Sequence, residues 1–125
     1  MFRWGEFQRS ASHFRLAWLA DAQRFGPVHP YTLMDATTCL ACAREWAKQS
    51  AAQGRKDEAF DVLENVRQLA LSIATDAMNA DPERQAMVAG ALEKISVVAA
   101  ELGAADFSAA VDEAGRRLRS ALQVE

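Results

Sequence analysis

The sequence predicts an all-α domain, either a helical bundle or a short helical solenoid, built from about five antiparallel helices. Three observations support this fold class. Apolar residues recur at steps of three and four along five segments, which places them on one face of each helix. No segment shows the alternation of apolar and polar residues that is typical of a half-buried strand. Glycine and proline stand between the periodic segments, where they end one helix and begin the next.

Length and composition agree with one globular unit. The chain has 125 residues, half of them apolar and a quarter charged, with both signs mixed. This balance is typical of a folded protein and far from the low hydrophobicity and high charge of a disordered chain. We therefore expect one all-α domain over residues 1–125 with one hydrophobic core.

An aromatic stripe defines the first helix, which is predicted over residues 3–24. The members of this stripe recur at helical steps along one face, and they are Trp4, Phe7, Ala11, Phe14, Trp18 and Phe25. Gly26 and Pro27 end the helix. The first 30 residues contain four arginines against two carboxylates, a net charge of +2 in a chain whose net charge is −3.

The second helix is predicted over residues 31–53. Pro30 suits a first helical turn, because its missing N–H needs no partner there. Thr32 and Asp35 have the spacing of a capping box. Gly54 then ends the helix.

Three further helices are predicted over residues 56–79, 82–102 and 106–123. The start of the fourth helix is marked by Asp81, a capping acceptor, followed by Pro82 in the first turn. Gly90, inside that helix, is expected to let a neighbouring helix backbone approach closely. Three arginines of the fifth helix are expected to complement its negative end: Arg116, Arg117 and Arg119.

The segment QGRKDEA, residues 53–59, resembles the turn between the two helices of a tetratricopeptide repeat. In that family a glycine ends one helix and a small alanine packs at the start of the next, positions that are filled here by Gly54 and Ala59. The resemblance covers residues 40–70. No proline closes the unit, and the family's aromatic, small and aromatic positions of the first helix are filled here by Ala43, Ala47 and Ser50.

A second glycine, Gly103, follows Gly54 after 49 residues and again has an aspartate three positions further on. The pattern therefore indicates two helix–glycine–helix hairpins preceded by an aromatic helix. The resemblance implies stacked hairpins with a concave groove on the first helix of each pair, and it implies binding of a peptide or protein. A closed bundle stays the alternative.

Cys39 and Cys42 form the one reactive-looking motif of the sequence. Three positions apart on a helix, the two thiols share a face and could bind a metal or form a redox pair. A zinc site would need His13 and His29 as further ligands, but neither has the short spacing of a zinc module. The simpler interpretation is two reduced thiols packed in the core. We expect no cofactor, and a metal- or redox-active domain built on Cys39 and Cys42 is the alternative function.

Charge and motifs argue against several classes of function. The net charge of −3 lacks the basic excess that binding to a phosphate backbone needs. No apolar run approaches the roughly 18 residues of a membrane span, and early charges such as Arg3 and Glu6 interrupt any signal-peptide core. No phosphate-binding loop, nucleophile elbow or metalloprotease motif is present, so enzymatic activity has no positive support. We expect a cytoplasmic protein that does not bind nucleic acid and does not span a membrane. Contact of the basic first helix with an acidic partner or a membrane surface stays an alternative.

The aromatic stripe remains as the candidate binding surface. Trp and Phe are typical of protein interfaces, so an exposed stripe would bind a partner protein or a second copy of the chain. The candidate residues are Trp4, Phe7, Phe14, Trp18 and Phe25. The alternative is that the stripe packs into the core, and both can hold if Phe14 and Trp18 are buried while Trp4 and Phe7 lie at an open edge.

These observations predict a protein-interaction module that acts by binding, such as an adaptor, a small chaperone, an inhibitor or an immunity-type protein. Homodimerisation through the aromatic helix is its simplest form. Binding of a small ligand between helices stays open, because such pockets leave little trace in a sequence.

Overall fold

The computed structural model describes residues 6–124 and confirms the all-α prediction. Its helices are α1 (Glu6–Phe25), α2 (Pro30–Ala52), α3 (Lys56–Ala77), α4 (Pro82–Glu101) and α5 (Ala105–Val124). Residues 6–124 contain no strand. Within this range the predicted helix ends differ from the observed ones by at most two residues. The predicted first turn at residues 3–5, including Trp4, lies outside the described residues.

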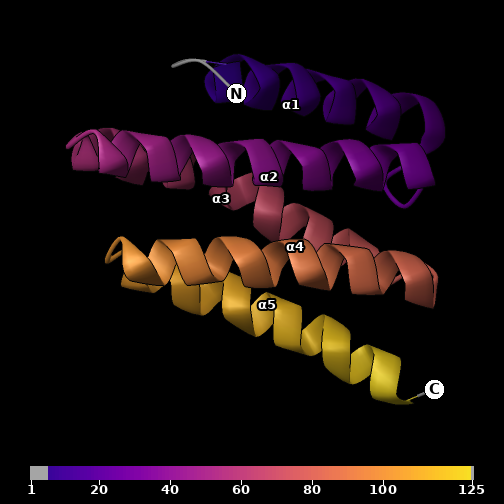
Figure 1. The fold of residues 1–125 in the computed structure, drawn as a ribbon. Helices are drawn as coiled ribbons and strands as arrows, with labels where there is room; N and C mark the ends of the chain where they lie inside the picture. Colours follow the sequence, from indigo (N-terminus) through magenta and orange to yellow (C-terminus); the bar gives the residue numbers. More distant parts are fainter. Residues whose placement is uncertain (1–5, 125) are drawn as a thin grey trace.

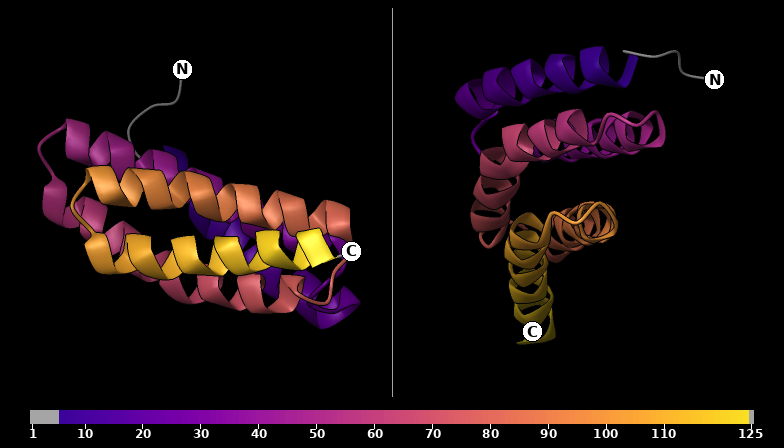
Figure 2. Two further views of the ribbon diagram at one scale, coloured as in Figure 1. Left: turned by 90° about the horizontal axis from the view of Figure 1, so that it is seen from below. Right: turned by 90° about the vertical axis from the view of Figure 1, so that its left-hand side faces the viewer.

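The helices form two hairpins, α2–α3 and α4–α5, with α1 laid on the first of them (Figure 1). The hairpins are stacked so that α2 runs in the same direction as α4, and α3 in the same direction as α5. Among the described helices α1 packs on α2 alone, whereas α5 packs on both α3 and α4. The end-on view in Figure 2 places α1 and α5 at opposite ends of this stack.

The two hairpins close through the same kind of turn. Gly54 and Gly103 adopt φ angles of +77° and +86°, which glycine reaches without the steric penalty of a Cβ. The amide of Arg55 then donates to the carbonyl of Ser50 at 2.8 Å, and the amide after Gly103 makes the equivalent bond, also at 2.8 Å. This pattern satisfies the last carbonyls of a helix while reversing the chain. The two glycines therefore set the two reversals on which the stack depends.

Helix α4 begins as predicted. The Asp81 carboxylate accepts a hydrogen bond from the amide of Arg84 at 2.8 Å, and Pro82 occupies the first turn. This cap satisfies an amide that would otherwise have no partner at the helix start.

The predicted capping box of α2 is wrong. The cap is His29, whose Nδ1 accepts a hydrogen bond from the amide of Tyr31 at 3.1 Å. The Thr32 hydroxyl points back along the chain and donates to the Gly26 carbonyl at 2.8 Å. Thr32 is buried, so its hydroxyl finds a partner in the preceding turn and ties the end of α1 to the start of α2.

Buried apolar side chains from α2 to α5 form one core cluster. Its largest fully buried members are Leu33, Leu40, Leu63, Ile73, Leu92, Ile95, Phe107 and Leu118. Alanines fill much of the remaining contact surface, which lets the helices approach closely. In α1, Ala11 is the one buried apolar residue among the described positions.

The close backbone approach expected at Gly90 occurs instead at Gly115. A Cβ added at Gly115 would touch the Ala89 carbonyl oxygen at 3.7 Å and the Leu92 Cβ at 3.7 Å. A Cβ added at Gly90 would meet no atom within 4 Å, so that position opens to space. The prediction for Gly90 is therefore wrong, and α4 packs closely against α5 on another face.

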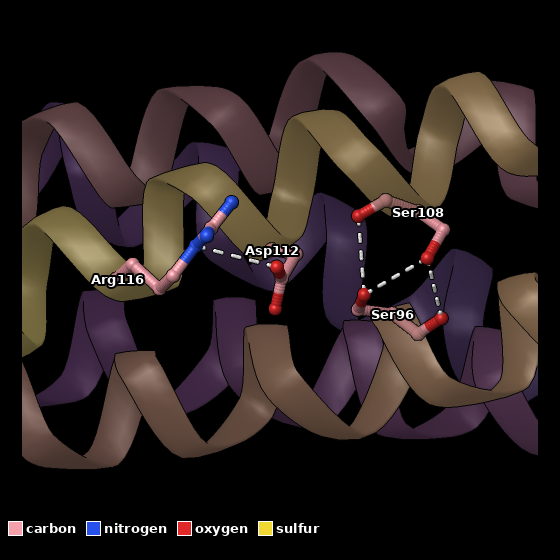
Figure 3. A network of polar contacts seen from close by, with 4 residues as sticks. All are labelled: Ser96, Ser108, Asp112 and Arg116. Carbon is pink, nitrogen blue, oxygen red and sulfur yellow. Dashed lines mark hydrogen bonds and ion pairs between the residues drawn. The ribbon is translucent and has the colours of Figure 1, made fainter.

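Polar contacts also join α4 to α5. Figure 3 shows Ser96 and Ser108 in a reciprocal pair, in which each hydroxyl donates to the other residue's carbonyl, at 3.1 and 3.0 Å. Further along, the Arg119 guanidinium binds both carboxylate oxygens of Glu93 at 2.9 and 3.2 Å. Arg116 pairs with Asp112 on its own helix at 3.3 Å.

The arginines of α5 thus form ion pairs with carboxylates and do not compensate the negative partial charge at the C-terminus of the helix. Arg117 completes the set, because its guanidinium lies 2.8 Å from the Glu113 carboxylate. The expectation that these side chains complement the helix C-terminus is wrong, because the last turn of α5 holds no basic residue.

Candidate functional site

The aromatic stripe of α1 is divided between the core and the surface. Phe14 and Trp18 are half-buried and pack against the core cluster. Phe7 is also half-buried, whereas Phe25 is 40% exposed at the end of the helix. Trp4 lies outside the described residues. The structure thus places Phe14 and Trp18 in a packing role, and binding of a partner by these residues stays a prediction.

An exposed apolar cluster surrounds the turn between α1 and α2, and we call it the aromatic corner. It consists of Phe25, Val28, His29, Tyr31 and Met34. Phe25 stacks on His29 with 4.6 Å between ring centroids and meets the edge of Tyr31 at 5.7 Å. Tyr31 and Met34 are 56% and 51% exposed. The rings hold one another in place, so the corner presents a preformed apolar surface.

Two carboxyl groups meet where α1 packs on α2. Asp35 of α2 shares a hydrogen bond with Asp21 of α1, and His13 lies close enough to act on it electrostatically. Burial, together with the neighbouring Asp21, raises the pKa of Asp35 to about 6 from an ordinary value of 3.8. The charged form of one carboxyl disfavours that of the other, so a shared proton stabilises this contact.

Cys39 lies on the side of α2 that meets α1, and Cys42 follows three positions later on the same helix. The Cys39 thiol is buried and donates to the Ala11 carbonyl at 3.2 Å. Burial raises the pKa of Cys39 to about 11 and also raises that of the half-buried Cys42. Reactive cysteines instead have a lowered pKa, because the thiolate is the nucleophile. The geometry therefore favours packed, protonated thiols.

The histidines that could complete a metal site do not join the cysteine pair. His29 caps α2 and stacks on Phe25, while His13 packs edge-on against Phe14 at 5.2 Å. Over residues 6–124, no three His, Cys, Asp or Glu side chains are arranged to hold a metal ion.

A groove runs between α2 and α4, the first helices of the two hairpins, and we call it the α2–α4 groove. Its volume is about 480 Å³. It is lined by Thr37, Thr38, Ala41, Arg44, Ala86, Met87, Gly90, Ala91 and Lys94. Small residues on both helices leave this space, and the missing side chain of Gly90 opens toward it.

The two ends of the α2–α4 groove differ in chemistry. At one end the hydroxyls of Thr37 and Thr38 both donate to the Met34 carbonyl, at 3.0 and 2.8 Å, which leaves their methyl groups for contact. At the other end stand two cations, Arg44 and Lys94. Arg44 lies 3.4 Å from Glu45, while Lys94 has no ion pair within residues 6–124. The groove therefore joins an apolar end to a positively charged end.

The sequence led us to expect a groove on the first helices of the hairpins through the resemblance alone and indicated none of its lining residues, although one signal pointed to them. Gly90 lies inside the continuous helix α4, where glycine costs about 1 kcal/mol relative to alanine. A glycine inside a helix therefore indicates a packing or a functional requirement at that position. To predict the residues that line this groove, one must know which helix lies beside α4. The apolar period of one helix does not give its neighbours.

None of the described helices has the length and apolar character needed to cross a membrane. Comparison of the chain with protein-family models, with curated proteins and with solved structures gave no match. The function must therefore be inferred from the surface geometry.

Proposed function

We propose that this protein is a protein-interaction module that binds a segment of a partner polypeptide in the α2–α4 groove. This proposal rests on the position of Gly90, which lines the groove with open space beside it. This glycine has ordinary helical backbone geometry and no neighbour within 4 Å of an added Cβ, so neither the fold nor the packing requires glycine there. A glycine that faces a groove instead lets the backbone of a bound segment come close.

The lining of the groove suits a polypeptide with apolar side chains and one carboxylate. Ala41, Ala91 and Gly90 leave room for a chain, and the half-buried Met87 offers an adaptable apolar contact. Arg44 and Lys94 would pair with an acidic side chain or a chain terminus, since opposite charges across an interface favour association. The whole chain is acidic, with a net charge of −3, so this pair of cations is a local departure.

The position of the groove supports the same conclusion. It lies on the first helix of each hairpin, where the resemblance to a tetratricopeptide repeat implies a binding surface. We accordingly extend the resemblance from residues 40–70 to both hairpins as part of this proposal. The similar glycine turns and the parallel course of α2 and α4 support that extension.

The test is a pair of matched leucine substitutions on α4. Gly90→Leu fills the groove, whereas Ala100→Leu places the same side chain at an exposed position outside it. Both variants should fold, because neither new side chain enters the core. Affinity purification from the native host with each variant and the wild type identifies proteins that the wild type and Ala100→Leu capture but Gly90→Leu does not. Calorimetry with the purified partner segment must then show at least a tenfold weaker binding to Gly90→Leu.

The cations supply a second arm of that experiment. Lys94→Gln should weaken binding of the partner segment mainly at low salt, because an exposed charge is screened as ionic strength rises. A segment that binds the wild type and Gly90→Leu equally well would overturn the proposal, whatever its charge.

Self-association is a second form of the same function, and the exposed side of α1 favours it. Leu16 is 67% exposed on the helix that packs on α2 alone, and the aromatic corner lies at the end of that helix. A two-fold interface brings the same surface of each copy together, so exposed apolar side chains such as Leu16 and Phe25 would meet their counterparts in the second copy. Phe25 belongs to this surface, so the proposed homodimer interface includes one residue of the predicted aromatic stripe.

Sedimentation analysis checks the homodimer. The wild type should dimerise with rising concentration, and Leu16→Gln combined with Tyr31→Gln should remain a monomer. A wild type that stays a monomer up to roughly 1 mM, the weak end of specific association, would exclude self-association and leave the groove as the binding surface.

A further inference from the structure

A second groove lies on another face of α2, between α1 and α3, and we call it the α1–α3 groove. It exists because α1 and α3 both flank α2 and do not pack against each other. Its volume is about 300 Å³. It is lined by Gln8, Ala11, Ser12, Arg15, Cys39, Trp46, Val62, Asn65 and Val66.

The floor of the α1–α3 groove is apolar and belongs to, or packs against, the core cluster. Trp46 is half-buried and packs against the core cluster, and Val62 and Val66 are buried members of that cluster. A half-buried indole combines a flat apolar face with a ring N–H. The floor therefore supplies the apolar surface that small-molecule sites commonly have.

The rim of the α1–α3 groove carries one charge, and that charge is positive. Arg15 makes no ion pair or hydrogen bond within residues 6–124, and none of the lining residues is acidic. The guanidinium stands close enough to Cys39 to oppose, through its charge, the rise of that thiol's pKa caused by burial. Gln8 and Asn65 add amide groups on either side. A guanidinium without a counter-ion above an apolar floor is complementary to a carboxylate with an apolar tail.

We propose that the α1–α3 groove binds a small amphipathic carboxylate, with its acid group on Arg15 and its apolar part on Trp46. The groove volume, about 300 Å³, is at the lower end for ligand sites and suits about a dozen non-hydrogen atoms. This site is independent of the α2–α4 groove, because the two grooves share no lining residue.

The experiment uses 4-phenylbutyrate and its neutral analogue 4-phenylbutanamide. These probes share the apolar part and differ in the charge that Arg15 would recognise. Binding is followed by the indole N–H signal of Trp46 in nitrogen–proton correlation spectra, assigned with a Trp46→Phe variant. Phenylbutyrate should shift this signal saturably with a dissociation constant of about 1 mM, as expected for a ligand of this size, and the amide should bind several-fold more weakly.

Two arginine variants complete the test. Arg15→Gln should bind phenylbutyrate no better than the wild type binds the amide. Arg9→Gln removes the same charge from an exposed site on the same helix outside the groove, and it should bind like the wild type. Equal binding of acid and amide, equal loss in both variants, or no saturable shift of the Trp46 signal would each overturn the proposal. Gly90→Leu should bind the probe unchanged, which separates this result from the test of the α2–α4 groove.

Discussion

Helices α1 and α5 stand at opposite ends of the stack and are held in different ways. Helix α1 is rich in aromatic residues, yet it packs on one neighbour and buries one apolar residue, Ala11. Helix α5 packs on two neighbours and buries Phe107, Val111 and Leu118. The comparison teaches that the number of neighbouring helices decides burial here more than the size of the side chains. Helix α1 is therefore the less buried end of the described stack, and α5 is the more buried end.

The largest difference should appear when one phenylalanine is removed from each helix. Phe107→Ala should lower the free energy of unfolding by about 3–5 kcal/mol, because the removal leaves a cavity in the core. Phe107 is 2% exposed, whereas Phe14 of α1 is only half-buried. Phe14→Ala should therefore cost about 1–2 kcal/mol. Urea denaturation measures both, and equal losses would contradict the comparison.

The serine pair tests the polar attachment of α5. Ser96→Ala removes the hydroxyl that donates to the Ser108 carbonyl, and we expect a loss of about 1 kcal/mol in the free energy of unfolding. Ser108→Ala should have a similar effect. The two residues contact each other, so the double variant should lose less than the sum of the single losses. Additive losses in chemical denaturation would show that the two hydroxyls act separately.

The contact between Asp21 of α1 and Asp35 of α2 should contribute more to the free energy of unfolding at low pH than at neutral pH. The pKa of Asp35 in the folded protein, about 6, lies above its ordinary value of 3.8, so the fold favours the protonated form. This contribution is complete below the ordinary value and is lost as pH rises through about 6. Asp35→Asn should therefore raise the free energy of unfolding by about 1 kcal/mol at pH 7.5, an effect reduced by partial exposure.

At pH 4 the same substitution should have little effect, because the wild-type carboxyl already holds a proton. Denaturation of both proteins at several pH values checks the sign. A stabilisation by Asp35→Asn that is equal at pH 4 and pH 7.5 would point to a cause other than the Asp21 and Asp35 contact.

The contribution of the Glu93–Arg119 ion pair to stability should depend on pH in the opposite direction, and its effect should be the smallest of those predicted here. The hydrogen bond from Arg119 lowers the pKa of Glu93, so this contribution is present at neutral pH and is lost as pH falls through the acidic range. Both side chains are nearly half-exposed, which weakens the pair. Glu93→Gln should slightly lower the melting temperature at pH 7 in low salt and leave it unchanged near pH 2. A larger effect at pH 2 than at pH 7 would contradict this assignment.

Features that depend on local sequence were predictable. The five helices, the Asp81 cap and the two glycine turns each depend on residues within one turn of the feature. The His29 cap was missed because a histidine rarely caps a helix, while Thr32 and Asp35 have a familiar spacing and other partners in space.

Features that depend on distant residues were not predictable. The apolar period of α1 shows which residues share a face, but the same pattern would fit a helix with one neighbour or with three. Gly90 and Gly115 look alike in the sequence, and only the placement of α2 and α5 beside α4 distinguishes an open groove from a close contact. The lining residues of both candidate grooves are of this kind, since each groove is formed between helices from different parts of the chain. The resemblance implied only that a groove would lie on the first helices of the hairpins.

The two glycine turns also bear on how the chain folds. Each turn joins helices separated by only a few residues, so α2 can find α3, and α4 can find α5, with little loss of chain entropy. Proteins dominated by such short-range contacts fold within about milliseconds or faster. Two hairpins that form independently offer two places for folding to start, and α1, which has a single neighbour, can dock last. The same helix would then be the first to leave when the native protein opens.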